Sequence, residues 1–105
     1  MDKEKILKEL GGIPEEVYDE LVDEFVSKTF EDIKSLKKLI SNNDLNGIAA
    51  LAHQLKGAAG NLRINAVFEA STLVEQTASE KGDTQKIAAL IASLEDKLKE
   101  FKSGK

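Results

Sequence analysis

The sequence predicts an all-α protein, an antiparallel up-down-up-down four-helix bundle with a short extra helix at the N-terminus. Three observations lead to this fold class. Apolar residues recur at helical spacing along almost the whole chain of 105 residues. One Pro, four Phe, one Tyr and no Trp are a poor supply of residues for an all-β fold. Four long helical segments are separated by connections of a few residues, which favours antiparallel neighbours.

Residues that start or stop helices divide the chain into five segments. A short first helix is predicted over about 2–10, because Gly11 and Gly12 stop it. The four bundle helices are predicted over about 14–41, 44–62, 65–81 and 84–101. Pro14 is tolerated in the first turn of a helix. The whole chain, 1–105, is therefore expected to be a single domain with one core.

Side chains at the predicted helix starts support these boundaries. Asp44 is a good N-cap for the second bundle helix, and Asn65 is predicted to cap the third. Asp83 or Thr84 is predicted to cap the last helix.

The apolar pattern includes large side chains of two of the bundle helices. Val17 and Leu21 belong to the pattern of the 14–41 helix, and Phe68 and Leu73 belong to that of the 65–81 helix.

Composition excludes several classes of function. The chain has no Cys, so it has no disulfide, thiolate metal site or cysteine nucleophile. No apolar run approaches the ~20 residues that a membrane-spanning helix needs, and the N-terminus is not a secretory signal. We therefore expect a cytoplasmic protein without membrane contact. The initial Met and the short first helix favour a free-standing protein over an excised domain.

The charge pattern argues against nucleic acid as a partner. The net charge is −4, and Lys and Glu are mixed along the chain without a basic stripe. No metal site is predicted from the sequence. A coiled-coil hairpin dimer is compatible with the composition, but wide apolar stripes and short helices favour a monomeric bundle.

His53, the only histidine, is predicted to point away from the core. At 100° per residue, one face of the 44–62 helix carries the apolar residues Leu45, Ile48, Ala52, Leu55, Ala59 and Leu62. The opposite face carries His53 with Asn46, Ala50, Gly57 and Gly60. The imidazole is therefore expected to stand exposed on a strip of small residues.

Two glycines on this strip need a reason, because each interior glycine costs roughly 1 kcal/mol relative to Ala. Gly60 could belong to a frayed helix end, whereas helical periodicity resumes after Gly57. We interpret Gly57 as clearing space beside His53. Such an open strip suits a reaction with a bulky macromolecular partner, since a small substrate would need a pocket. Lys56, three residues after His53, could reach a phosphoryl group on the imidazole.

The run from His53 to Leu62 resembles the His-x-Leu-Lys-Gly signature of histidine-containing phosphotransfer (HPt) domains, the intermediates of two-component phosphorelays. The resemblance extends over nearly the whole chain. It implies a four-helix bundle in which His53 is phosphorylated on its solvent-facing nitrogen. Lys56 would then stabilise the phosphoryl group, and Gly57 would leave room for it.

Two further positions are informative in the light of this resemblance. Glu75, 22 residues after His53, lies where the family commonly has a Glu or Gln that can orient the imidazole. Arg63 departs from the pattern, because many members have Gly after the residue corresponding to Leu62. This bulky cation could change the helix exit or the partner surface. It lies ~15 Å along the helix axis from His53, too far to contact the phosphoryl group.

The resemblance implies receiver domains of response regulators, or a hybrid sensor histidine kinase, as partners. We expect Ala49, Ala50, Gln54 and Gly60 to contribute to the docking surface. The chain shows no P-loop, no Gly-rich nucleotide loop and no Asp cluster for Mg²⁺. No cofactor and no autonomous kinase activity are therefore expected, and the receiver domain would supply the acceptor aspartate and Mg²⁺.

Two alternative functions stay open on the sequence. The chain could be an interaction bundle in which His53 is inert. It could instead be an enzyme that uses His53 as a general base oriented by Glu75. The second alternative requires an enclosed pocket around the histidine.

Overall fold

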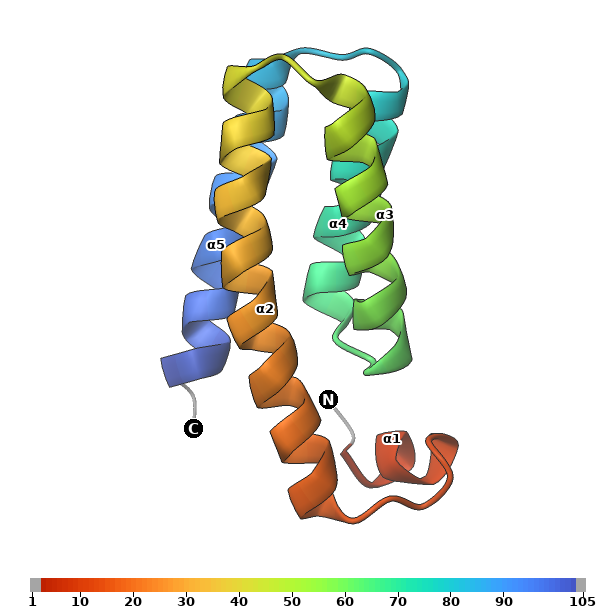
Figure 1. Ribbon diagram of the computed structural model, residues 1–105. Helices are drawn as coiled ribbons and strands as arrows, with labels where there is room; N and C mark the ends of the chain where they lie inside the picture. The colour runs from red at the N-terminus through yellow and green to blue at the C-terminus, as the bar shows by residue number, and fades with distance from the viewer. Residues whose placement is uncertain (1–2, 104–105) are drawn as a thin grey trace.

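The computed structural model describes the backbone of residues 3–103 and the side chains of residues 3–100. This part of the chain forms five helices and no strand (Figure 1). The helices are α1 (Lys3–Glu9), α2 (Glu15–Ser41), α3 (Leu45–Asn61), α4 (Asn65–Ser79) and α5 (Thr84–Ser103). The predicted all-α fold class is confirmed. The predicted start of the first helix at Asp2 lies outside the described residues.

The four long helices form the predicted bundle. They pack in the cyclic order α2, α3, α4, α5 and back to α2 (Figure 1). Consecutive helices run antiparallel because only three or four residues connect them. The molecule is accordingly elongated, with extents of 42 × 24 × 17 Å. The centre of the bundle is filled by aliphatic side chains from all four helices, among them Ile33, Leu36, Ile48, Val67, Val74, Ile91 and Leu94.

The short helix α1 covers one end of the bundle. The first turns of α2 extend past the connection between α3 and α4, and α1 packs into this corner (Figure 1). Ile6 of α1 is buried there. Tyr18 of α2 is also buried, and its hydroxyl donates a hydrogen bond of 2.6 Å to the carbonyl oxygen of Leu62. None of the described helices is both long enough and apolar enough to cross a membrane.

The three connections inside the bundle share one backbone closure. Each contains a residue other than Gly with positive φ: Asn43 (55°), Arg63 (61°) and Lys81 (56°). The following N–H bonds back to the last turn of the helix, namely Asp44 N to Leu39 O (2.9 Å), Ile64 N to Ala59 O (2.9 Å) and Gly82 N to Thr77 O (2.8 Å). This Schellman arrangement satisfies carbonyls that the helix end would leave unpaired.

Two of the predicted N-caps are observed. The Asp44 carboxylate accepts a hydrogen bond of 2.9 Å from the N–H of Gly47. The Asp83 carboxylate accepts one of 2.8 Å from the N–H of Gln85. Both helices therefore begin where a short acidic side chain satisfies a free backbone N–H.

The prediction that Asn65 caps the third bundle helix is wrong. Ile64 occupies the cap position, without a side-chain hydrogen bond, and Asn65 is the first helical residue. Burial of Ile64 and its place in the closure that ends α3 account for this shift. α4 also ends at Ser79, two residues earlier than predicted, because Lys81 adopts the left-handed conformation that closes the helix.

Four apolar residues of the predicted pattern are exposed. They are Val17 (41%), Leu21 (40%), Phe68 (40%) and Leu73 (49%). They lie at the margins of their apolar stripes, and neighbouring helices bury only part of each circumference. Large exposed apolar side chains are candidates for contacts with a partner.

Candidate functional site

His53 lies in the middle of α3 and points away from the core. Its side chain is 67% exposed, whereas Ile48, Ala52, Leu55 and Ala59 of the same helix are buried. The orientation expected from the helical wheel is therefore observed. The imidazole stands on the outer surface of the bundle, open to a macromolecule.

Glu75 of α4 holds one nitrogen of the imidazole. Antiparallel packing of α3 and α4 brings the Oε2 atom of Glu75 to 2.9 Å from Nδ1 of His53. An ionised carboxylate only accepts hydrogen bonds, so Nδ1 carries the proton and donates it to Glu75. The neutral ring then has its lone pair on Nε2, the nitrogen that Glu75 does not engage. The position suggested by the family resemblance is thus in contact with the histidine.

Lys56 contacts the same carboxylate. Its Nζ atom lies 2.8 Å from Oε1 of Glu75, so the two oxygens of Glu75 serve two different side chains. Both members of this ion pair are mostly covered, with Lys56 29% and Glu75 24% exposed. His53 and Lys56 are three residues apart and lie on the side of α3 that faces α4.

The cation next to Glu75 keeps the carboxylate ionised. The hydrogen bond from Lys56 holds the pKa of the Glu75 carboxyl below its ordinary value. Burial opposes this effect, and the hydrogen bond from His53 acts in the same direction as Lys56. Glu75 is therefore an acceptor at neutral pH, as the orientation of His53 requires.

The two glycines near His53 have different surroundings. A Cβ atom added at Gly57 would meet nothing within 4 Å, so this glycine leaves open space. A Cβ atom added at Gly60 would meet two ring carbons of Phe68 at 3.4 Å. Gly60 lies in the last turn of α3, whose end is closed by backbone hydrogen bonds from Arg63 and Ile64. Gly57 thus keeps the surface low, whereas Gly60 lets the Phe68 ring lie against α3.

The expected docking residues are only partly on the surface. Ala50 and Gln54 are exposed, Ala49 is partly buried against the core, and Gly60 is partly covered. The structure adds Phe68 on the α4 side of the strip, a residue that the sequence pattern assigned to the interior. A large apolar residue packed opposite a glycine could have indicated this surface. Sequence alone does not show that Phe68 lies opposite Gly60, because that pairing depends on the register of α3 and α4.

Leu21 is a further apolar side chain on the α2 side of α3. A shallow groove between the two helices is lined by Phe25 and Lys28 of α2 and by Gln54 and Ala58 of α3, among others. Leu21 lies one turn before Phe25 on α2, and it is 40% exposed. Leu21 and Phe25 are four residues apart, so Leu21 lies on the face of α2 that borders this groove.

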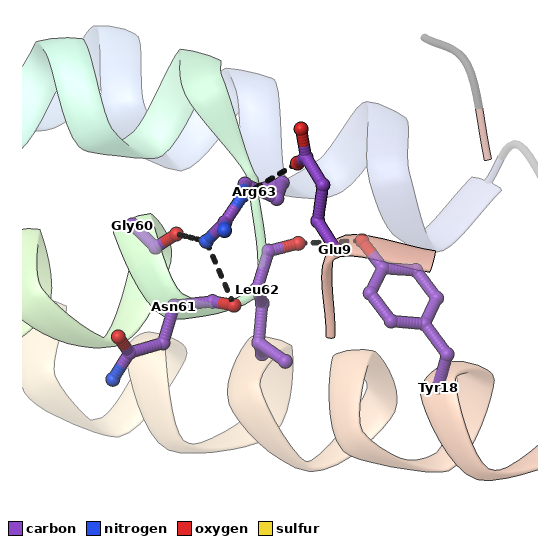
Figure 2. Close-up of polar contacts among 6 residues, drawn as sticks. All are labelled: Glu9, Tyr18, Gly60, Asn61, Leu62 and Arg63. Atoms are coloured by element: carbon purple, nitrogen blue, oxygen red, sulfur yellow. Dashed lines mark hydrogen bonds and ion pairs between the residues drawn. The ribbon is translucent and has the colours of Figure 1, made fainter. Parts of the chain in front are cut away.

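Arg63 does not belong to the His53 cluster. Its guanidinium donates to the carbonyls of Gly60 (2.8 Å) and Asn61 (3.4 Å) at the end of α3, and Nε bonds to Glu9 of α1 at 3.1 Å (Figure 2). The backbone of Arg63 adopts the left-handed conformation that a glycine would favour. The departure from the family pattern thus leaves the helix exit in place and connects α1 to α3.

The described residues contain no group of three or more His, Cys, Asp or Glu side chains arranged to hold a metal ion. The reactive features of the site are therefore one exposed imidazole nitrogen, one ammonium and one carboxylate that contacts both residues.

Comparison with protein families identifies the chain. The family model described as Hpt domain matches residues 20–104, which include the His53 cluster, all of α3, α4 and α5, and α2 from residue 20 onward. Comparisons with curated proteins and with solved structures give no match. Hpt domains are phosphotransfer modules of two-component systems and are not kinases. Because the match covers most of the chain, this protein belongs to the Hpt domain family.

Proposed function

We propose that His53 accepts a phosphoryl group from the aspartate of response-regulator receiver domains and returns it to them. One observation carries this proposal: Glu75 engages Nδ1 at 2.9 Å, which leaves the Nε2 lone pair of a 67% exposed ring free to react. The open space at Gly57 supports it, because a receiver domain must approach closely.

The transfer is a displacement at phosphorus. The Nε2 lone pair attacks the phosphorus of the receiver's aspartyl phosphate and forms an N–P bond. The P–O bond to the aspartate breaks, and the aspartate leaves as a carboxylate with the electron pair. The imidazole gains positive charge in this step, and the Glu75 carboxylate on Nδ1–H stabilises that charge. The reverse reaction returns the phosphoryl group, and we expect Mg²⁺ to be bound by the receiver domain.

The surface around His53 supports a receiver domain as the partner. Ala50, Gln54 and Gly57 form a low strip on α3. Phe68 of α4 lies against this helix at Gly60, and the exposed Leu21 lies one turn before Phe25, which lines the groove between α2 and α3. We propose that Phe68 and Leu21 provide the apolar contacts of docking, and that the strip lets the aspartate reach Nε2. The partly buried Ala49 contributes less.

A transfer assay tests the proposal. The protein is incubated with a receiver domain that carries radiolabelled aspartyl phosphate. We expect label on the protein that is labile in acid and stable in base, and no label on His53→Gln. Because His53 is the only histidine, phosphohistidine can arise at no other position. Label that persists on His53→Gln would contradict the proposal.

The same assay separates the alternatives. An inert interaction bundle would not become labelled although it binds its partner. A general base would also remain unlabelled, and the exposure of His53 already disfavours it because such a base works in an enclosed site.

Gly57→Leu tests the steric part of the proposal. The side chain would enter open space, so we expect a folded protein whose labelling by receiver domains falls roughly 10-fold, which corresponds to a clash of about 1.4 kcal/mol in the docked complex. Labelling by phosphoramidate, a small phosphodonor, should change little. Gly57→Ala is the matched control with one methyl group. Normal exchange between Gly57→Leu and the receiver domain would show that open space is not needed.

A further inference from the structure

The Lys56 ammonium is already paired before any phosphoryl group arrives. It lies 2.8 Å from Oε1 of Glu75, while Oε2 of the same carboxylate lies 2.9 Å from Nδ1 of His53. The pair is less exposed than the histidine, at 29% and 24% against 67%. Partial removal from water strengthens the attraction between the two charges relative to a fully solvated pair.

Phosphorylation of His53 would create competition for this ammonium. A phosphoryl group brings close to two negative charges and three acceptor oxygens. Lys56 is three residues from His53 on the same side of α3, within reach of a group on the imidazole. The ammonium would then be drawn both to the phosphoryl oxygens and to the carboxylate that holds it now. To the extent that Glu75 keeps its attraction for Lys56, the ammonium stabilises the phosphoryl group less.

We propose that Glu75 limits the stability of phospho-His53 by retaining Lys56, and thereby shifts the exchange equilibrium toward the receiver's aspartyl phosphate. This inference rests on the proposed phosphorylation of His53. Glu75 is thus a positioning residue with two opposing effects. Through Oε2 it orients the ring for attack, and through Oε1 it weakens the hold of the domain on the phosphoryl group.

Glu75→Gln separates the two effects. The amide oxygen of Gln still accepts a hydrogen bond from Nδ1–H of His53, but the amide has no charge to retain Lys56. If Glu75 acts through Lys56, the substitution strengthens the hold on the phosphoryl group only when Lys56 is present. If Glu75 acts directly, by repelling the phosphoryl group or by stabilising the charged ring, the substitution has the same effect with and without Lys56. A double-mutant cycle distinguishes these cases.

The experiment compares wild type, Glu75→Gln, Lys56→Gln and the double variant. Each is brought to equilibrium with the same phosphorylated receiver domain, and the ratio of phosphohistidine to aspartyl phosphate is measured from their different stabilities in acid and base. We expect Glu75→Gln to raise this ratio about 5-fold when Lys56 is present and less than about 2-fold in the Lys56→Gln background, the range that partly exposed ion pairs allow. Equal increases in both backgrounds would overturn the inference.

Two further variants serve as controls. Lys56→Arg keeps the positive charge, so in this background Glu75→Gln should again raise the ratio; failure to do so would count against retention of the cation. Glu69→Gln removes an exposed carboxylate from α4, the helix that carries Glu75, and should leave the ratio of phosphohistidine to aspartyl phosphate unchanged. Absence of any label on wild-type His53 would instead refute the proposed function itself.

Discussion

At the residue scale, a single carboxylate organises the chemistry of this domain. Glu75 accepts from Nδ1 of His53 and pairs with Lys56, so its ionisation sets both the tautomer of the ring and the position of the cation. Its own ionisation depends in turn on Lys56, which is the main cause of its lowered pKa. Three side chains from two helices are therefore coupled through one group.

Protonation of Glu75 should lower the stability of the protein in acid. The pKa of Glu75 in the folded protein lies below its ordinary value of 4.5. Its contribution to stability is therefore fully present above about pH 4.5 and is lost as the pH falls through the folded value. A ¹³C NMR titration of the Glu75 carboxyl should give a midpoint below 4.5, moving upward in Lys56→Gln. A midpoint at or above 4.5 in the wild type would contradict the pairing.

The second prediction concerns Arg63, whose left-handed backbone (φ 61°) is unfavourable for a residue with a Cβ atom. Arg63→Ala keeps this cost and loses the hydrogen bonds to Gly60 and Glu9. Arg63→Gly loses the same bonds but removes the cost. We expect the Gly variant to be more stable than the Ala variant by about 1 kcal/mol in urea unfolding. Equal stability would show that this conformation is not strained.

At the element scale, α3 has a capped N-terminus and a destabilising glycine near its middle. Asp44 caps its first turn through the N–H of Gly47, whereas Gly57 interrupts its exposed face with open space. A Cβ atom at the first glycine would press on the Asp44 side chain that forms the cap. The second is destabilising for the helix and useful only if something approaches His53.

Alanine at these two glycines should have opposite effects on stability. A Cβ atom at Gly47 would lie 2.7 Å from the Asp44 carboxylate and 2.9 Å from Leu39. We therefore expect Gly47→Ala to disturb the cap and cost about 1 kcal/mol. Gly57→Ala meets no neighbour and should stabilise the helix by about 1 kcal/mol. The midpoints of urea unfolding of the two variants test this prediction. Shifts of both midpoints in the same direction from wild type would contradict the different roles given to the two glycines.

At the scale of the whole molecule, α1 lies outside the region that the Hpt family model matches. The family match begins at residue 20, after α1 and the first turn of α2. α1 is held by burial of Ile6, by ion pairs from Lys3 to Asp19 (2.7 Å) and Glu15 (3.0 Å), and by Glu9 with Arg63 at 3.1 Å. These contacts close the end of the core and lie away from the His53 cluster.

Removal of residues 1–12 should therefore lower stability without removing the chemistry. We expect a loss of roughly 2 kcal/mol, mostly from Ile6, and unchanged labelling of His53 by phosphoramidate. Ile6→Ala should reproduce most of the loss in urea unfolding, whereas Lys8→Ala, at an exposed position of the same helix, should not. A truncated protein that folds but cannot be labelled would show that α1 supports the site.

Much of this fold could be predicted from the sequence because the signals are local. The 3.6-residue repeat defined the helices, the acidic caps Asp44 and Asp83 defined two of their starts, and the wheel alone turned His53 away from the core. The cap at Asn65 was predicted incorrectly because local preference was overridden by burial of Ile64.

The sequence by itself thus determined the number of helices, their approximate ends and an exposed imidazole beside an open glycine. Only the tertiary structure decided that Glu75 contacts Lys56 as well as His53, and that Phe68 lies against Gly60 with part of its ring exposed. The physical reason is that the face of a helix depends on its own periodicity, whereas contacts between α3 and α4 depend on their register. That register is set by packing in the core of the bundle and by the backbone hydrogen bonds that close the connection at Arg63. Core packing depends on residues from all four long helices.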